Sequence, residues 1–338
     1  MIIRRPEYYD RFRCLAGLCP DSCCQDWEVT VDDAAAERYR ALSGSLGDAL
    51  REKLVFEEGA WSLKITDGRC PMWQRDGLCR IQCELGEGGL CQVCRDFPRL
   101  RHDYGTFVEL GLELSCPEAA RLILNAEPAK PLTTATSDEG VAEYDTEAME
   151  VLLRTREQAL EILSTGTVEQ ALTMLLLYGY RAQEELDWGE PASWDGEKAL
   201  AFAQTIAAHS SPQPLIQLYS QLDILTDRWR QRLAQPNPAP QWAPQLRAMA
   251  RYGVERHWLQ AVSDYDLACR VKMIVSGCVL VHYLGGDPVA TAQLWSKEIE
   301  NSADNLDSLL DAAYSSPLMT DALLLGLLQN SHFQSNPR

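Results

Sequence analysis

Hydrophobic and polar residues alternate with two different periodicities along this chain. The stretch 107–114 reads FVELGLEL, and its apolar side chains alternate with glutamates and a glycine. A repeat of two residues predicts a strand that is buried on one face. Two shorter stretches, DWEVTV at 26–31 and WSLKI at 61–65, are also predicted to be strands because they hold aromatic and β-branched residues.

Beyond residue 140 the repeat becomes helical. In 145–164 and 168–180 the apolar residues recur every three or four positions and form one stripe on a helix. Similar patterns predict helices at 195–208, 213–234, 245–262, 264–284, 288–301, 303–315 and 319–329. Shorter helices are expected earlier in the chain, at 32–42, 45–56 and 117–126. We therefore predict a mainly α protein.

The stretch 127–140, EPAKPLTTATSDEG, separates these two parts and shows no periodicity. Its prolines, threonines and serines are typical of a connecting segment, and a length of 338 residues suggests about two domains. We predict an irregular, Cys-rich α+β metal-binding N-terminal domain over 1–127. A linker over 128–140 and an all-α helical C-terminal domain over 141–338 follow.

Ten of the twelve cysteines lie between positions 14 and 116. Disulfides, inert buried thiols and a metal or iron–sulfur site are the alternatives. The first residues contain no apolar segment of signal-peptide length and no cleavage site, so we expect a cytoplasmic protein. In a reducing compartment, clustered cysteines more often bind metal or act in catalysis than form disulfides. We therefore favour a metal-binding role for this cluster.

Composition and charge narrow the range of partners. The formal net charge of −18 argues against a nucleic-acid partner, because phosphate binding depends on Lys and Arg patches. No apolar run approaches the roughly 18 residues that span a membrane, so no membrane partner is expected. A basic or lysine-bearing protein is the partner that this charge would attract.

The spacing of the cysteines does not decide between metals. The first block is C-x4-C-x3-C-C, and the second is C-x8-C-x3-C-x7-C-x2-C. A zinc site typically shows two C-x2-C pairs, and only Cys91 and Cys94 have that form. An iron–sulfur cluster accepts less regular spacing. Arg95 and Arg99 follow at once and would offset thiolate charge or bind an anionic group of a cofactor.

Other catalytic motifs are missing from the chain. It contains no P-loop, no G-x-S-x-G, no H-E-x-x-H and no G-x-G-x-x-G after a strand. The radical S-adenosylmethionine spacing C-x3-C-x2-C is also absent. Cys278 and His282 lie four residues apart on an apolar helix face, where we expect them to be core residues.

Four segments, in order, resemble the flagellin lysine N-methyltransferase family, within a broader group of cysteine-rich zinc- or iron-chelating domains. They read CLAGLCPDSCCQDWEV, CPMWQRDGLCRI, LGEGGLCQVCRDFPR and ELSCPEAARLIL. The C-R-x-F-P element of that group matches Cys94, Arg95, Phe97 and Pro98. The resemblance covers about residues 5–125.

The resemblance implies methyl transfer from S-adenosyl-L-methionine to lysines of flagellin, supported by a cysteine-ligated [4Fe–4S] cluster, with zinc as the alternative. The predicted metal ligands are Cys14, Cys19, Cys23, Cys24, Cys70, Cys79, Cys91 and Cys94, with Cys83 and Cys116 second in rank. No catalytic base is identified, although Asp96, Glu113 and Tyr104 lie near the motifs. A zinc- or cluster-stabilised binding module without chemistry and a redox or electron-transfer protein are the other classes.

Overall fold

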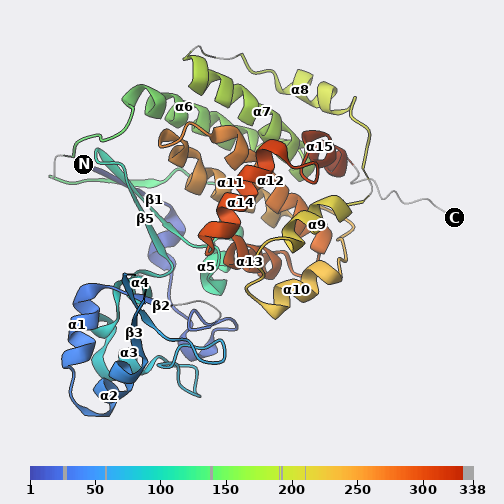
Figure 1. Ribbon diagram of the computed structural model, residues 1–338. Helices are drawn as coiled ribbons and strands as arrows, with labels where there is room; N and C mark the ends of the chain where they lie inside the picture. The colour runs from blue at the N-terminus through green and yellow to red at the C-terminus, as the bar shows by residue number, and fades with distance from the viewer. Residues whose placement is uncertain are drawn as a thin grey trace.

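A large helical body and a smaller cysteine-bearing lobe make up the molecule in this computed structural model (Figure 1). The structure describes residues 1–25, 29–57, 59–137, 140–189, 191, 193–209 and 211–329. The chain is mainly α with two small sheets, as predicted. Residues 26–28 of the predicted strand 26–31 and the last nine residues of the predicted helical domain lie outside the described residues.

The first sheet lies along one side of the helical body (Figure 1) and has the strand order β5-β6-β1-β7. Its strands are β1 (Ile2–Arg5), β5 (Arg99–Asp103), β6 (Phe107–Leu112) and β7 (Leu132–Ala135). β6 confirms the predicted strand but ends two residues earlier. β1 runs parallel to β6 and antiparallel to β7. The stretch expected to be a linker thus contains a strand, because its backbone supplies the partner for the free edge of β1.

The second sheet belongs to the lobe and has the order β2-β4-β3, with both pairs antiparallel. Its strands are β2 (Val29–Val31), β3 (Leu54–Glu57) and β4 (Ala60–Leu63), and the helices α1 (Asp33–Ala41) and α2 (Gly44–Lys53) connect β2 to β3. The helix predicted over 45–56 therefore ends early. Phe56 lies opposite Trp61 with their rings 4.9 Å apart, and this aromatic cross-strand pair favours a strand there.

Short elements lie between and beside the cysteines, and only Cys83 in 80–85 and Cys94 in 92–96 lie within one. They are η1 (Glu7–Arg11), η2 (Ala16–Leu18), α3 (Arg80–Leu85), η3 (Glu87–Gly89), α4 (Gln92–Asp96) and α5 (Pro117–Leu124). Pro117 occupies the first turn of α5, where its missing N–H costs no helical hydrogen bond.

The helical body contains helices at all the predicted places, with different bounds at some of them. The helix predicted over 168–180 continues to Trp188, the one predicted over 195–208 ends at Ala203, and those predicted over 213–234 and 245–262 are each divided. The helices of the body are α6 (Thr146–Ile162), α7 (Val168–Trp188), α8 (Gly196–Ala203), α9 (Gln213–Ser220), α10 (Asp227–Ala234), α11 (Pro244–His257), η4 (Trp258–Val262), α12 (Leu267–Leu284), α13 (Pro288–Ile299), α14 (Ala303–Ser315) and α15 (Asp321–Gln329). The single helix predicted over 213–234 is two helices, because Thr226 caps α10 and also donates a hydrogen bond to Glu298.

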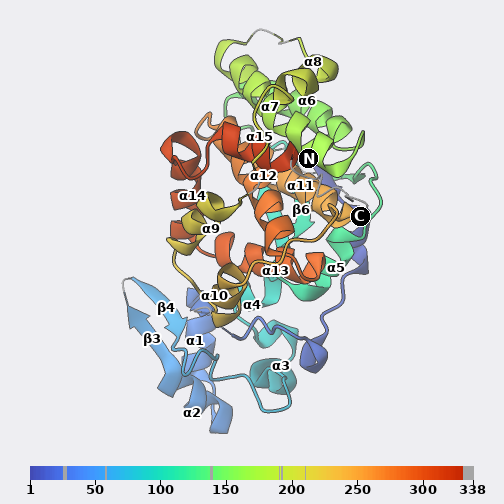
Figure 2. The ribbon, with the colours of Figure 1, turned by 90° about the vertical axis from the view of Figure 1, so that its right-hand side faces the viewer.

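Helix α12 lies at the centre of this body (Figures 1 and 2). All its residues except Ala268 are buried. With 18 residues and a mean hydropathy of 1.5, it is long and apolar enough to cross a membrane, which the sequence analysis did not anticipate. Neighbouring helices bury 94% of it, as they do for the core helix of a globular protein.

Two hydrophobic cores hold the molecule together. The smaller one contains β2, α1, α2 and the cysteines Cys70 and Cys91. The larger one contains Tyr8, Phe12 and nine buried residues between 107 and 124, together with buried residues from the helices of the body. Residues on the N-terminal side of the predicted boundary at 127 thus share the core of the helical body.

Candidate cysteine centre

Three separate segments bring their cysteines to the junction between the lobe and the helical body. They are the loop 14–25, the block 70–94 and Cys116, which caps the start of α5. The backbone N–H of Cys70 donates to the carbonyl of Cys24 at 2.9 Å, and Gln25 forms a bridge with Arg69. The first two cysteine blocks are therefore joined through their backbones.

Two glycines allow these blocks to touch. A Cβ added to Gly17 would lie 2.8 Å from the carbonyl oxygen of Asp76, and one added to Gly77 would lie 3.1 Å from the Cα of Gly17. Gly77 also has a φ of +82°, which glycine adopts without strain. Only residues without a side chain fit at this contact, so the glycines set how closely the two cysteine loops approach.

Two adjoining cavities lie among the cysteines. The larger has a volume of about 460 Å³ and the smaller about 60 Å³. The larger is lined by Cys14, Cys19, Cys23, Cys24, Cys79, Cys94 and Cys116. The smaller is lined by Cys23, Cys24, Cys70, Cys79, Cys91 and Cys94. Every predicted ligand thus lines at least one cavity, four of them line both, and Cys116 joins them, whereas Cys83 lines neither.

Neighbouring thiols influence one another's ionisation. A hydrogen bond from Cys23 lowers the pKa of Cys24 to about 7, and one from Cys94 lowers the pKa of Cys91 to about 7. Burial raises the pKa of Cys70 to about 12. One thiol of each close pair is therefore the easier of the two to ionise, and thiolate is the form that binds metal.

The donor set has the chemistry that a thiophilic metal or cluster requires. All ten cysteines between 14 and 116 are free thiols, and soft thiolates select zinc and iron–sulfur clusters. In the described part of the chain, no group of three or more His, Cys, Asp or Glu side chains is arranged to hold a metal ion. The thiols line cavities and do not form a closed coordination site. Binding of a metal or cluster would therefore require the cysteine side chains to move closer together.

The two predicted cofactor-binding arginines line the larger cavity together with Arg13. The guanidinium of Arg99 lies 5.3 Å from the centre of the Phe12 ring, and Arg95 lies 3.6 Å from a carboxylate oxygen of Asp96. Both arginines are thus positioned to offset thiolate charge, and their contact with a cofactor stays a prediction.

Neither cysteine cavity is lined by the two acids and the phenol near the motifs, which are Asp96, Glu113 and Tyr104. Tyr104 stacks on Phe107, with their ring centres 4.9 Å apart. Glu113 forms an ion pair with Arg256 at 3.5 Å. The carboxylates that do line the larger cavity are those of Asp21, Glu87 and Glu118. The sequence did not single them out, although Asp21 and Glu87 lie within the two cysteine blocks, because spacing alone does not show which carboxylates face a cavity.

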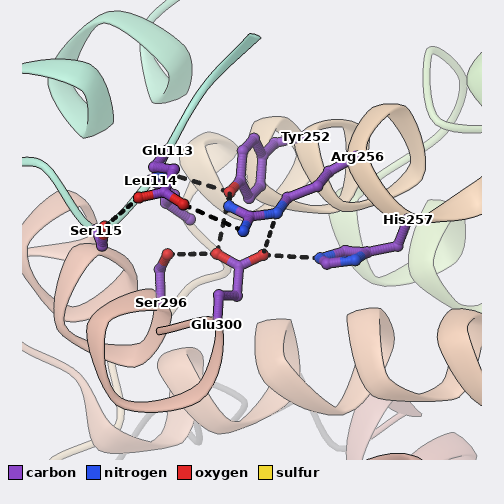
Figure 3. A network of polar contacts seen from close by, with 8 residues as sticks. All are labelled: Glu113, Leu114, Ser115, Tyr252, Arg256, His257, Ser296 and Glu300. Atoms are coloured by element: carbon purple, nitrogen blue, oxygen red, sulfur yellow. Dashed lines mark hydrogen bonds and ion pairs between the residues drawn. The ribbon is translucent and has the colours of Figure 1, made fainter. Parts of the chain in front are cut away.

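A buried polar network joins α11, the end of α13 and the segment 113–115 (Figure 3). Glu300 accepts hydrogen bonds from His257 at 2.8 Å, from Tyr252 at 3.0 Å and from Ser296. Burial alone would raise the pKa of Glu300, but Arg256 and His257 hold it at about 2. The hydroxyl of Tyr252 accepts the backbone N–H of Leu114. The network therefore reaches the segment that leads into Cys116.

Cys278 and His282 on α12 are core residues, as predicted. His282 stacks on Trp242 with ring centres 3.9 Å apart, and Cys278 is fully buried. Neither residue lines the cysteine cavities.

Comparisons with known proteins find three relatives. A stretch of 141 residues is 31% identical to the Lysine-N-methylase of Salmonella typhimurium and 30% identical to that of Salmonella choleraesuis, covering 40% of this chain. The match spans 35% of each relative, about a third of its length. A stretch of 137 residues is 31% identical to the flagellar biosynthetic protein FliU of Salmonella muenchen, covering 38% of this chain and 81% of that protein. No family profile and no solved structure matches the chain.

Proposed function

Because this chain belongs to the flagellin lysine methylase family, we propose that it transfers methyl groups from S-adenosyl-L-methionine to lysines of a flagellin-like protein. The similarity to proteins named Lysine-N-methylase carries the proposal and supports a methyltransferase role. The similarity to a flagellar biosynthetic protein supports a protein substrate in a flagellar setting. Neither a nucleic acid nor a membrane forms part of the proposal.

We further propose that the cysteine centre holds a [4Fe–4S] cluster, with zinc as the alternative. Cys23, Cys24, Cys79 and Cys94 are the central candidates because each lines both cavities. With three of these thiols as ligands, the fourth iron of the bound cluster would have no cysteine and would offer a position for the amino and carboxylate groups of the methyl donor. The protein would work in the cytosol, where these ten thiols stay reduced.

The reaction requires a neutral lysine. A lysine ammonium has an unperturbed pKa of about 10.4 and must lose its proton before its nitrogen can attack. A carboxylate within reach accepts that proton, and partial burial of the ammonium eases the loss. Glu87 is the candidate base: it lines the larger cavity, and among the described residues it has no ion-pair partner. The nitrogen then bonds to the methyl carbon, while the carbon–sulfur bond breaks and leaves its electrons on sulfur.

Arginines complete the proposed site. Arg13, Arg95 and Arg99 line the cavity that the cysteines share. Their charge would counter the thiolates and would attract the carboxylate end of the donor. Because the donor's sulfonium is positive, the methyl group is expected to lie on the side of the thiols and Glu87, away from these arginines.

The test is methyl transfer by protein purified without oxygen. We expect brown protein containing about four irons to add one CH₂ in mass per methylated lysine when it receives flagellin and the donor. Glu87→Gln should lower the rate and leave the iron content unchanged. Iron-loaded protein that binds the donor but never methylates flagellin would contradict the proposed activity. Colourless protein with stoichiometric zinc and no donor binding would favour the binding module.

A further inference from the structure

The loop that carries the first cysteines has little packing of its own. No residue from Arg13 to Gln25 is buried, and Leu18 is 88% exposed. Its regular structure consists of the three-residue η2. Such a loop would sample many conformations unless side chains tied it to a rigid neighbour. The position of Cys19 and Cys23 therefore depends on what anchors this loop.

Asp21 provides an anchor midway between these two cysteines. Its carboxylate is only 8% exposed and accepts hydrogen bonds from Lys297 Nζ and Gln293 Nε2, each at 2.9 Å. Arg228 on α10 lies 3.6 Å from the same carboxylate. Figures 1 and 2 show α10 and α13 on the side of the helical body that faces the cysteine lobe. A single loop side chain thus binds two helices of the body.

Helix α13 also binds the backbone of the residue that precedes Cys116. Gln293 Nε2 donates a second hydrogen bond, of 2.6 Å, to the backbone carbonyl of Ser115. Gln293, Ser296, Lys297 and Glu300 lie at i, i+3, i+4 and i+7 and share one helix face. This polar stripe therefore contacts two cysteine segments that lie about a hundred residues apart in the chain.

Helix α13 is itself immobilised in the helical body. Glu298 accepts hydrogen bonds from Thr226 and from the backbone N–H of Leu225, and Glu300 binds Arg256 and His257. Behind Asp21, a cavity of about 20 Å³ is lined by Cys23, Phe97 and Lys297. The anchor therefore joins the loop to a rigid element directly beside a cysteine.

We propose that Asp21 is a positioning residue, which fixes the cysteine loop to the polar stripe of α13 and so presents Cys19 and Cys23 to the shared cavity. The helical body then takes part in building the cysteine centre, in addition to any role in substrate binding. The consequence for methyl transfer rests on the proposed function, whereas the placement of the thiols does not.

The anchor is expected to be strong because its charges are buried. Removing one partner of a buried ion pair leaves the other desolvated and unpaired, which is much more costly than losing a surface pair. Asp21→Asn removes the charge and keeps the shape of the side chain. Lys297→Met removes the positive partner of the Asp21 carboxylate. If the contact positions the loop, both changes release it.

The experiment measures the alkylation of each cysteine in metal-free protein by mass spectrometry. We expect Asp21→Asn and Lys297→Met to speed the labelling of Cys19 and Cys23 by roughly tenfold or more, while Cys70 keeps its rate. Lys272→Met is the matched control, because Lys272 is also buried and pairs with Asp321 at 3.0 Å, far along the chain from the cysteine loop.

Two outcomes would overturn the proposal. Labelling of Cys19 and Cys23 that stays at the wild-type rate in both variants would show that Asp21 does not hold the loop. Equal acceleration in Lys272→Met would show a general loosening of the helical body. Thermal melting monitors folding of each variant, and the visible spectrum after iron loading gives a second readout. Because labelling needs no methyl transfer, its result stands whether or not wild-type protein methylates flagellin.

Discussion

Cys79 and Cys83 lie four residues apart and share a backbone hydrogen bond of 3.0 Å, yet only Cys79 lines the cysteine cavities. Cys79 precedes α3 and faces both cavities, whereas Cys83 lies within the helix and is exposed. A turn of helix therefore separates two thiols that the spacing C-x3-C alone would place at one site.

This difference predicts opposite results for the two serine variants. Cys79→Ser should lose most of its bound metal, because serine oxygen is a poor substitute for a thiolate ligand. Cys83→Ser should keep its metal, which makes it the matched control. Metal analysis and the visible spectrum of protein purified without oxygen provide the measurement. Equal loss in both variants would contradict the arrangement of the thiols described above.

The close contact of the two cysteine loops predicts a steric effect at Gly17. Gly17→Ala would place a Cβ 2.8 Å from the backbone oxygen of Asp76, so the loops must separate. We expect weaker metal binding in this variant. Gly88→Ala is the control, because its added Cβ would meet no atom within 4 Å. Metal affinity measured by competition with a chelator should fall only in Gly17→Ala, and similar affinities would count against this contact.

Removal of the metal should loosen the lobe more than the helical body. The core of the lobe is small and includes Cys70 and Cys91, whereas the body has a separate and much larger core. Because metal binding and folding are coupled in cysteine-rich segments, chelation should speed amide hydrogen exchange in residues 64–98. Exchange in α7 and α12 should change little. Uniform acceleration across both parts would show that they unfold as one unit.

Loss of the Glu300 carboxylate should destabilise the helical body. Its side chain is 1% exposed and pairs with Arg256 and His257. Glu300→Gln removes the negative charge that pairs with the buried guanidinium of Arg256. We therefore expect the free energy of unfolding to fall by about 3 kcal/mol. Urea denaturation measures the change. Glu157→Gln, at an exposed position of α6, should alter stability by less than about 0.5 kcal/mol.

His282 should make the protein sensitive to mild acid. Burial lowers its pKa from 6.5 to about 4, so the folded state prefers the neutral imidazole. The unfolded chain binds the proton first, and stability is lost as the pH falls from 6.5 toward 4. This loss amounts to roughly 3 kcal/mol for a shift of that size. His282→Phe keeps a ring beside Trp242 and should lose less stability over this range; identical pH profiles of the melting temperature would refute the assignment.

The prediction of the helices succeeded where periodicity and capping agreed. Apolar stripes located α6 and α12 to α15 closely, because each helix buries one face or its whole surface in a common core, whereas α7 continues eight residues beyond the predicted end at 180. The short strand β7 was missed, since its four residues are all exposed and only pairing with β1 makes them a strand. The glutamate of β6 was also misleading as a sign of an exposed face: Glu109 is partly buried and binds Arg156 in a bidentate pair.

The sequence by itself determined that ten thiols gather in the first third of the chain and that helices follow, because cysteine spacing and apolar periodicity are local properties. Only the tertiary structure decided which thiols face a common cavity and that Asp21 and Gln293 join the cysteine loop to α13. Those contacts link residues more than 250 positions apart, and no local pattern encodes them, since they arise from the packing of one core against another.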